Sequence, residues 1–320
     1  MEKRFNTPIL FLIFNRPDTT AQVFQQIRKM KPSRLYVAAD GPRLNKPSEK
    51  DLCDKTRDII KGVDWDCQLK TLFRDENFGC KNAVSKAIGW FFDNEEEGII
   101  IEDDCLPNDD FFYFCETMLE KYRSDDRIAT IGGDNSSRAI GSNPDYDFTF
   151  SKYPLIWGWA TWRRAWKDYD PDIKKWLQIK ESSLLKNVFN NQVLVDHWYN
   201  IFDKMYNKEI DTWDYQLTFS CLINNRLSVV SKKNLIKNIG FRNDATHTVG
   251  ESDRANIETE KISFPLSIPD FVIDDTKYDK EIETKCFGID FSAAAYGFKK
   301  RARKVKQKIK NFIKKIIGKK

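Results

Sequence analysis

Short apolar runs alternate with helical patterns along the first 135 residues. Residues 9–14 (ILFLIF) are apolar on both faces, as in a parallel strand that is covered on both sides. Shorter runs predict strands at residues 35–38, 68–73, 98–101 and 128–131, and helical spacing between them predicts helices around residues 84–92 and 111–119. The pattern predicts an α/β fold with a mostly parallel central sheet flanked by helices, of the Rossmann-like kind.

From Tyr153 onward the pattern changes to a region rich in tryptophan, then a helical stretch to about Asn225 and a proline-interrupted segment to Ile273. No internal repeat and no proline- or serine-rich linker separates the two halves. We therefore expect residues 1–150 and 151–297 to form two lobes of one unit, followed by a separate tail at residues 298–320.

The tail carries twelve Lys or Arg residues and no acid, so the net charge of +5 becomes −7 once it is set aside. Apolar residues recur along it at helical spacing, which predicts a basic amphipathic helix on an anionic membrane surface. The alternative is a solvated or nucleic-acid-binding tail. The two aromatic residues of the tail, Phe298 and Phe312, belong to its apolar stripe and are not interleaved with the basic residues for base stacking, so we expect no nucleic-acid partner.

Composition and the absence of known motifs argue against several classes of protein. With 41% hydrophobic residues the chain can bury a large core, yet no apolar run approaches about 20 residues and the first 15 residues do not resemble a signal peptide. We expect a cytoplasmic protein, peripheral at the inner face of the cytoplasmic membrane. Seven cysteines without a CxxC pair imply neither a disulfide framework nor a zinc site. GxSxG, HExxH, GxGxxG and GxxxxGK[ST] are all absent.

In open α/β sheets ligands bind beyond the carboxyl ends of the strands. The segments there are Asn15–Pro17, Asp40–Arg43, Arg74–Gly79 and Glu102–Asp104. Three adjacent acids after a buried strand repel each other, and a divalent cation such as Mg²⁺ or Mn²⁺ bridging phosphates relieves that repulsion. The cation would neutralise a diphosphate leaving group. The alternative is a solvated turn in which Asp109 or Asp110 caps the next helix.

A second acid is needed in the other lobe if an acceptor hydroxyl is to lose its proton. Asp214, within an aromatic segment at residues 211–216, is the candidate general base. The alternative is a solvated acid in the first turn of a helix.

From about residue 7 to residue 248, the chain resembles inverting glycosyltransferases of the GT-A fold. The closest likeness is to the N-acetylglucosaminyltransferase I type and its bacterial nucleotide-diphospho-sugar transferase relatives. The matching stretches, in order, are Pro8–Arg16, Val37–Gly41, Glu102–Leu106 with Asp110–Phe114, Tyr153–Thr161 and Trp213-Asp214.

The resemblance implies roles for single residues. Asp104 would hold the metal, Glu102 and Asp103 would face the ribose and diphosphate, and Asp214 would be the base. Arg16 and Asp40 would contact the nucleotide, and Trp159, with Trp157, would line the sugar pocket. Gly240–Arg242 with Thr246–Thr248 resembles a loop over the diphosphate, and by that resemblance His247 would be a neighbour of the phosphate or the metal. Here Ile239-Gly240-Phe241 replaces the family's Phe-Gly order and the spacing glycine is missing.

Together these observations predict a metal-dependent inverting glycosyltransferase. Residues 1–150 would bind the nucleotide sugar and residues 151–297 the acceptor. The donor would be a UDP-sugar, with UDP-GlcNAc suggested by the resemblance, and the acceptor a glycan or lipid-linked glycan hydroxyl in surface polysaccharide synthesis. One alternative is a sugar-1-phosphate nucleotidyltransferase, although the loop after the first strand is not the glycine-rich one such an enzyme needs. Another is a non-catalytic peripheral membrane protein.

Overall fold

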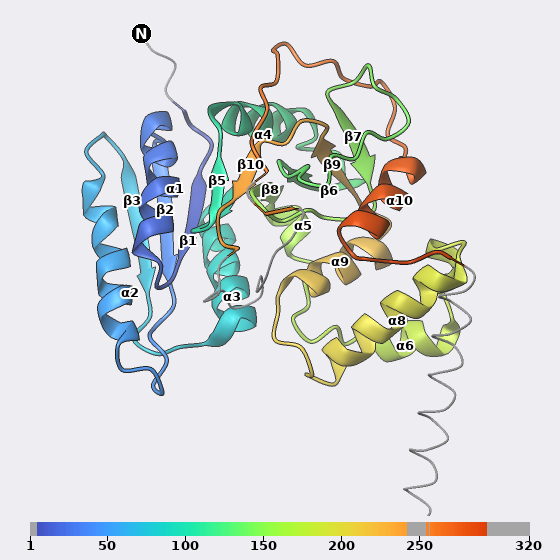
Figure 1. Ribbon diagram of the computed structural model, residues 1–320, viewed down its shortest axis with the longest axis horizontal. Helices are drawn as coiled ribbons and strands as arrows, with labels where there is room; N and C mark the ends of the chain where they lie inside the picture. The colour runs from blue at the N-terminus through green and yellow to red at the C-terminus, as the bar shows by residue number, and fades with distance from the viewer. Residues whose placement is uncertain (1–4, 242–253, 256, 293–320) are drawn as a thin grey trace, which may run out of the picture.

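The structure is a computed structural model, which describes residues 5–241, 254–255 and 257–292 (Figure 1). Eight strands form one sheet in the order β3-β2-β1-β4-β8-β6-β9-β7, and β10 and β5 form a separate pair. The strands are β1 (Ile9–Ile13), β2 (Arg34–Ala39), β3 (Gln68–Phe73), β4 (Glu97–Glu102), β5 (Cys105–Pro107), β6 (Ile128–Gly132), β7 (Phe148–Ser151), β8 (Trp159–Trp162), β9 (Leu227–Ser231) and β10 (Ile236–Asn238).

The helices cover both faces of this sheet. They are α1 (Pro17–Met30), α2 (Glu49–Asp58) with the short 3-10 helix η1 (Ile59–Gly62), α3 (Gly79–Asn94), α4 (Asp109–Lys121), α5 (Arg163–Trp166), α6 (Trp176–Ser182), α7 (Leu185–Val188), α8 (Gln192–Tyr206), α9 (Asp214–Ile223) and α10 (Thr276–Lys285). Side chains of α1 and α4 share one core with one face of β1, β2 and β4, and side chains of α3, α5 and α9 share another with the opposite face.

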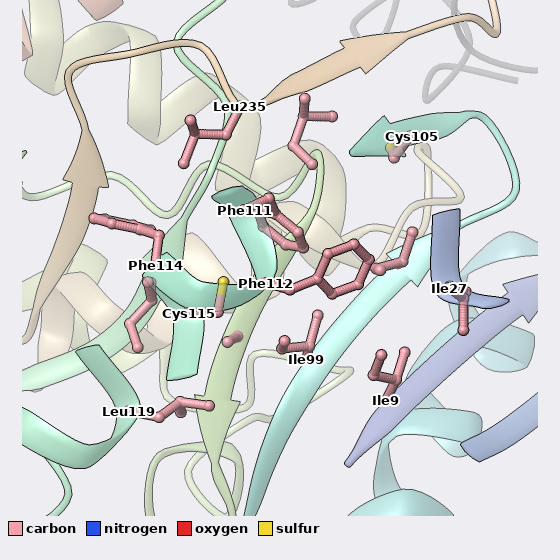
Figure 2. Close-up of a cluster of buried hydrophobic side chains, with 14 of the residues drawn as sticks. Ile9, Ile27, Ile99, Cys105, Phe111, Phe112, Phe114, Cys115, Leu119 and Leu235 are labelled. Carbon is pink, nitrogen blue, oxygen red and sulfur yellow. The ribbon is translucent and has the colours of Figure 1, made fainter. Parts of the chain in front are cut away.

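The alternation of side chains along β1 explains this three-layer arrangement. Ile9 and Phe11 pack toward α1 and α4, whereas Leu10 and Leu12 pack toward α3 and α9, and all four are buried. Figure 2 shows the first of these cores, with Phe111 and Phe112 of α4 lying beside Ile99 of β4 and Ile9 of β1. Apolar strands buried on both faces are the signature of parallel sheets, so the prediction of an α/β fold is confirmed.

The five predicted strands are present as β1, β2, β3, β4 and β6. The sheet nevertheless continues into the second half of the chain. There β8 lies antiparallel between β4 and β6, and β7 lies antiparallel to β9. The sequence pattern missed these strands because each has only four or five residues, too few for periodicity to separate from the surrounding Trp-rich and helical segments.

A third core lies under α8 and α10, built around the buried rings of Tyr153, Trp176 and Trp198. Its helices lie on the opposite side of the molecule from α1 and α2 (Figure 1). Within the described residues, no helix is both long and apolar enough to cross a membrane. The division into two lobes at residue 150 remains a prediction. The tail at residues 298–320 also remains a prediction, because it lies outside the described residues.

Candidate active site

Parallel strands bring their carboxyl ends to one edge of a sheet, and several candidate residues lie at or just after these ends. β1 pairs in parallel with both β2 and β4, so Arg16, Asp40 and the acids from Glu102 to Asp104 leave the same edge. Leu12 of β1 lies directly opposite Glu102.

Asp103 is buried at the base of this acidic cluster. Its Oδ2 accepts a hydrogen bond from the backbone N–H of Phe14 at 3.0 Å and a longer one from Thr20 Oγ1 at 3.5 Å. The guanidinium of Arg16 lies 3.9 Å from Oδ1. Burial, and then the neighbouring charge of Asp104, raise the pKa of Asp103 to about 7. The favourable contacts therefore do not offset the cost of charging this carboxyl.

Asp104 is the more open acid, with 16% of its side chain exposed. Arg16 Nη1 donates to Asp104 Oδ2 at 2.7 Å. The antiparallel pair of β5 and β10 brings a distant segment alongside, and Ile239 N–H donates to the carbonyl oxygen of Asp104 at 2.8 Å. A Cβ on Gly240 would lie 2.2 Å from Asp104 Oδ2, so a glycine is required where this segment passes the carboxylate.

Glu102 connects this cluster to the second half of the chain. Burial raises its pKa well above the usual range, and the charges of Asp104, Asp103 and Asp214 raise it further, while Arg16 lowers it. The charge of Asp214 also contributes to raising the pKa of Cys80 and of Tyr169. Asp214 therefore lies near enough for its charge to act on Glu102, although Asp214 and Asp104 are 110 residues apart in the chain.

Asp214 is the first residue of α9 and is partly buried. Thr212 Oγ1 donates a hydrogen bond to its Oδ1. The preceding Trp213 stacks on Trp159 with ring centroids 5.6 Å apart, and Tyr169 donates its hydroxyl proton to the carbonyl oxygen of Trp213 at 3.1 Å. Tyr169 in turn stacks on Trp166 at 4.2 Å. These rings, which we call the aromatic frame (Trp159, Trp166, Tyr169, Trp213), fix the backbone from which Asp214 projects.

Asp211 connects the same loop to the first half of the chain. Its Oδ1 accepts from the backbone N–H of Lys81 at 3.4 Å, in the first turn of α3. Gly79 begins that helix with a φ of +74°, and a Cβ there would lie 3.1 Å from Asp211 Oδ2. An acid at a helix N-terminus is favoured by the exposed N–H groups and the helix dipole. The loop before Asp214 is thus held by α3 as well as by the aromatic frame.

The carboxylate of Asp40 receives hydrogen bonds from its own lobe. Both of its oxygens lie 3.0 Å from Phe78 N, and Asn77 Nδ2 donates to Oδ2 at 3.0 Å. Burial raises the pKa of Asp40 despite these bonds. Asp40 therefore shapes the loop after β3, and a contact with a nucleotide base stays a prediction.

Trp159 does not present a ring face to a sugar in this structure. Its side chain is 0% exposed and packs against Trp213 and Trp166 of the aromatic frame. Trp157 is partly exposed, with the guanidinium of Arg254 4.1 Å from its ring centroid and Phe241 packed edge-on at 5.6 Å. His247 lies outside the described residues.

Sequence reasoning did not single out Gly79, Tyr169, Asp211 or Thr212 as site residues. Two signals were available, because Gly79 ends a segment that follows a strand and Asp211 and Thr212 belong to the segment that contains Asp214. Nothing in the sequence distinguishes Tyr169 from other tyrosines. Similarly, the cap of α4 is Asn108, which accepts from Phe111 N–H at 3.0 Å, and not Asp109 or Asp110.

The donors at this edge suit a hard divalent cation, since they are carboxylate oxygens in a cluster short of positive charge. Within the described part of the chain, no three His, Cys, Asp or Glu side chains converge as a ready-made metal site. A cation on Asp104 would therefore need phosphate oxygens and water to complete its coordination. The cation would also have to displace the guanidinium of Arg16, which donates a hydrogen bond to Asp104 Oδ2.

No protein-family profile and no curated protein sequence matches this chain. Solved structures with a similar fold include HddC from Yersinia pseudotuberculosis (12% identity, 51% of this chain and 80% of that one, TM-score 0.32). They also include 4-diphosphocytidyl-2C-methyl-D-erythritol synthase from Anaerococcus prevotii (10% identity, 70% of this chain and 88% of that one, TM-score 0.34). A third is UDP-glucose pyrophosphorylase complexed with UDP-glucose (10% identity, 51% of this chain and 79% of that one, TM-score 0.31). The pyrophosphorylase corresponds to the nucleotidyltransferase alternative and not to a glycosyltransferase, but similarities at this level do not decide between the two.

Proposed function

We propose that this chain is a metal-dependent inverting glycosyltransferase that moves a sugar from a UDP-sugar to the hydroxyl of a glycan or glycolipid. The observation that carries the proposal is that Asp214 lies near enough to Glu102, at the end of β4, for its charge to act on that carboxyl. In this proposal, a leaving-group site and a candidate base come from different halves of the chain and share one edge of the sheet. UDP-GlcNAc is the donor we would test first.

In this proposal Asp214 accepts the proton of the acceptor hydroxyl as that oxygen attacks the sugar carbon. Thr212 and the aromatic frame hold the carboxylate in place, which reduces the entropy lost on reaching the transition state. Asp103 and Glu102 face the ribose and diphosphate. Arg16 moves from Asp104 to a phosphate of the nucleotide, where its guanidinium forms charge-assisted hydrogen bonds.

Asp104 is the residue that would hold Mg²⁺ or Mn²⁺. When bound, the cation supplies positive charge that stabilises the departing UDP. The raised pKa values of Glu102 and Asp103 support this assignment, because added positive charge would favour their ionised forms.

The second candidate is a sugar-1-phosphate nucleotidyltransferase, which would join UTP and a sugar phosphate with release of pyrophosphate. One feature of the chain supports this candidate: the basic residue that follows β1, Arg16, lies against the acids of the cluster. It is opposed by the composition of that loop, Asn15-Arg16-Pro17-Asp18, which has no glycine. It also leaves Asp214 without a role.

Product analysis separates the two candidates. The purified protein is incubated with UDP-sugars, Mn²⁺ and a detergent extract of membrane glycans, and separately with UTP, sugar 1-phosphates and Mg²⁺. The proposal predicts UDP release in the first mixture, which Asp214→Asn abolishes, and no pyrophosphate in the second. Pyrophosphate from the second mixture without UDP from the first would replace the proposal with the alternative.

We further propose that residues 298–320 hold the enzyme at an anionic membrane surface, at the inner face of the cytoplasmic membrane. The support is the sequence, with twelve basic residues and an apolar stripe at helical spacing. Co-sedimentation with vesicles containing phosphatidylserine tests it. The full chain should bind and a chain ending at residue 297 should not, and equal binding of both would remove the tail from the account.

A further inference from the structure

β3 is the outer strand at one end of the eight-stranded sheet, and its free edge is unprotected (Figure 1). Within the described residues only β2 pairs with it. Proteins usually protect such an edge with a proline, a bulge or an inward-pointing charge. β3 has no proline, its register with β2 is unbroken, and its one lysine, Lys70, donates to Asn94 Oδ1 at 2.7 Å. The edge therefore presents backbone donors and acceptors to another strand.

The hydrogen bonds to β2 show which residues of β3 face outward. Gln68 N–H donates to the Ser33 carbonyl oxygen at 2.9 Å, and Arg74 N–H donates to the Ala39 carbonyl oxygen at 3.0 Å. Backbone N–H and C=O groups alternate in direction along a strand, so the even-numbered residues of β3 face β2 and the odd-numbered residues face away. The outward-facing residues are Leu69, Thr71 and Phe73.

The same residues carry exposed side chains on one face of the sheet. Leu69 is 38% exposed and Phe73 is 37% exposed, and Thr71 between them is exposed as well. Together with Ile60 of η1 they line a groove of about 410 Å³ beside α2. A strand added to this edge would gain backbone hydrogen bonds and apolar side-chain contacts at the same positions.

The spacing of these residues is symmetric, which favours a second copy of β3 as the added strand. Leu69 and Phe73 lie two residues on either side of Thr71. When a second β3 lies antiparallel across a two-fold axis at Thr71, Leu69 lies opposite the partner's Phe73. In this register every outward N–H and C=O group of β3 is paired, and each apolar side chain meets another. A two-fold axis at Leu69 or at Phe73 would leave some of these groups unpaired.

Charges beside the groove are complementary in the same register. The groove is lined by two acids and two bases, namely Asp54, Asp58, Arg57 and Lys61. The guanidinium of Arg57 lies 5.3 Å from the ring centroid of Phe73, and the chain runs from there through η1 back to the start of β3. Asp54, one turn before Arg57, therefore lies at the Phe73 end, whereas Lys61 lies toward Leu69. Because Leu69 lies opposite the partner's Phe73, Lys61 comes beside the partner's Asp54.

We propose that two copies of this chain associate through β3, antiparallel and centred on Thr71, so that their sheets join into one continuous sheet. This inference goes beyond the proposed function and does not depend on it. Pairing along β3 leaves the acids after β4 uncovered, since they lie at the carboxyl ends of the strands and not along the outer edge. The carboxyl ends of the two copies face opposite ways, so the proposal concerns the chain in solution and not two copies on one membrane surface.

Sedimentation velocity of the full chain, without lipid and over a range of micromolar concentrations, tests the proposal. We expect a dimer, and we expect Leu69→Lys to weaken it about 100-fold, because each new ammonium group would face the partner's Phe73. Adding Phe73→Glu to Leu69→Lys should restore the dimer, since opposite charges then face each other. Leu177→Lys is the matched control, because Leu177 is a similarly exposed leucine (43%) on α6, and it should leave the dimer unchanged.

Thr71→Pro tests the backbone pairing separately. It removes an N–H group that faces outward and none that bonds to β2, so the variant should fold, as circular dichroism would show, and should be a monomer.

Hydrogen exchange gives a second measurement. The amides of Leu69, Thr71 and Phe73 should exchange slowly in the dimer and fast in the Leu69→Lys variant, whereas those of Lys70 and Leu72 should exchange slowly in both. A monomeric parent chain would overturn the proposal. It would also be overturned by a dimer that Leu69→Lys and Thr71→Pro leave intact, since association would then use another surface. Failure of the double variant to regain the dimer would contradict the register centred on Thr71.

Discussion

The acids of α10 and the acids at the end of β4 have different surroundings. Beside the third core, under α10, Asp279 accepts hydrogen bonds from Ser151 Oγ at 2.6 Å and from the backbone N–H of Lys152, whose ammonium group lies 3.6 Å away. Glu283 nearby accepts the hydroxyl proton of Tyr153 at 2.6 Å. At the end of β4, burial and the neighbouring charges of Asp104, Asp103 and Asp214 instead raise the pKa of Glu102.

This comparison indicates which of the two sets of acids has a structural role. The acids of α10 are matched by donors and a lysine that belong to the fold, so they anchor that helix to β7. The acids after β4 are placed side by side by the chain itself, with Asp104 left partly open. A fold gains nothing from such crowding, which is why we assign the cluster to ligand binding.

The largest expected effect is at the candidate base. Asp214→Asn keeps the shape of the side chain but cannot take a proton, so the rate of sugar transfer should fall about 10³-fold. Binding of the UDP-sugar should be unchanged. UDP release measures the first and calorimetry the second. Asp58→Asn, at an exposed acid of α2, is the control, and a rate equal to it would remove Asp214 from the mechanism.

The structural acids should show a different response, to pH. The folded state raises the pKa of Asp279 to about 7, mainly through burial, so between pH 4 and 7 the native chain binds more protons here than the unfolded chain. Stability from this group therefore falls as pH rises through that window, by on the order of 4 kcal/mol. Urea denaturation at pH 5 and pH 8 should show about 3 kcal/mol of this fall in the parent and a smaller fall in Asp279→Asn. Parallel pH profiles would contradict the assigned environment.

Gly240→Ala tests the crowding at Asp104 directly. The added methyl group would lie 2.2 Å from Oδ2, so the carboxylate must move, and cation-dependent binding of the UDP-sugar should weaken about tenfold or more. Gly89→Ala is the matched control, because a Cβ there meets nothing within 4 Å and the change within α3 should be neutral or stabilising. Equal donor affinity in both variants would mean that Asp104 does not hold the cation.

The smallest effect concerns the aromatic frame. Tyr169→Phe removes one hydrogen bond to the Trp213 carbonyl, and we expect kcat to fall about fivefold with little change in KM for the donor. Tyr199→Phe removes a similar bond, from Tyr199 Oη to the Lys180 carbonyl at 3.2 Å, far from the site. Both should cost about 1 kcal/mol in stability, but only the first should change kcat. The same kcat in both would make Tyr169 purely structural.

The sequence allowed the first half of the fold to be predicted, because apolar residues on both faces of β1, β2 and β4 leave few alternatives to a parallel sheet. It also allowed the acids after β4 to be found, since their place after Ile99–Ile101 is visible in the chain. The antiparallel β8 was not foreseeable from four residues of mixed character.

The placement of single aromatic rings was not predictable either. Trp159 and Trp157 lie two residues apart, yet one is buried in the aromatic frame and the other lies at the surface against Arg254. An indole can fill a core or line a sugar site, and only tertiary packing decides which. Likewise, the approach of Asp214 to Glu102 depends on contacts between segments 110 residues apart.

The most direct test of the account is thermal unfolding across a panel of UDP-sugars, with and without Mn²⁺, in the parent chain and in Asp104→Asn. A ligand that binds only the folded state raises the midpoint by mass action, so no acceptor is needed. We predict a shift with at least one UDP-sugar that requires the cation and disappears in Asp104→Asn. A well-folded parent that shows no shift with any UDP-sugar would contradict the account.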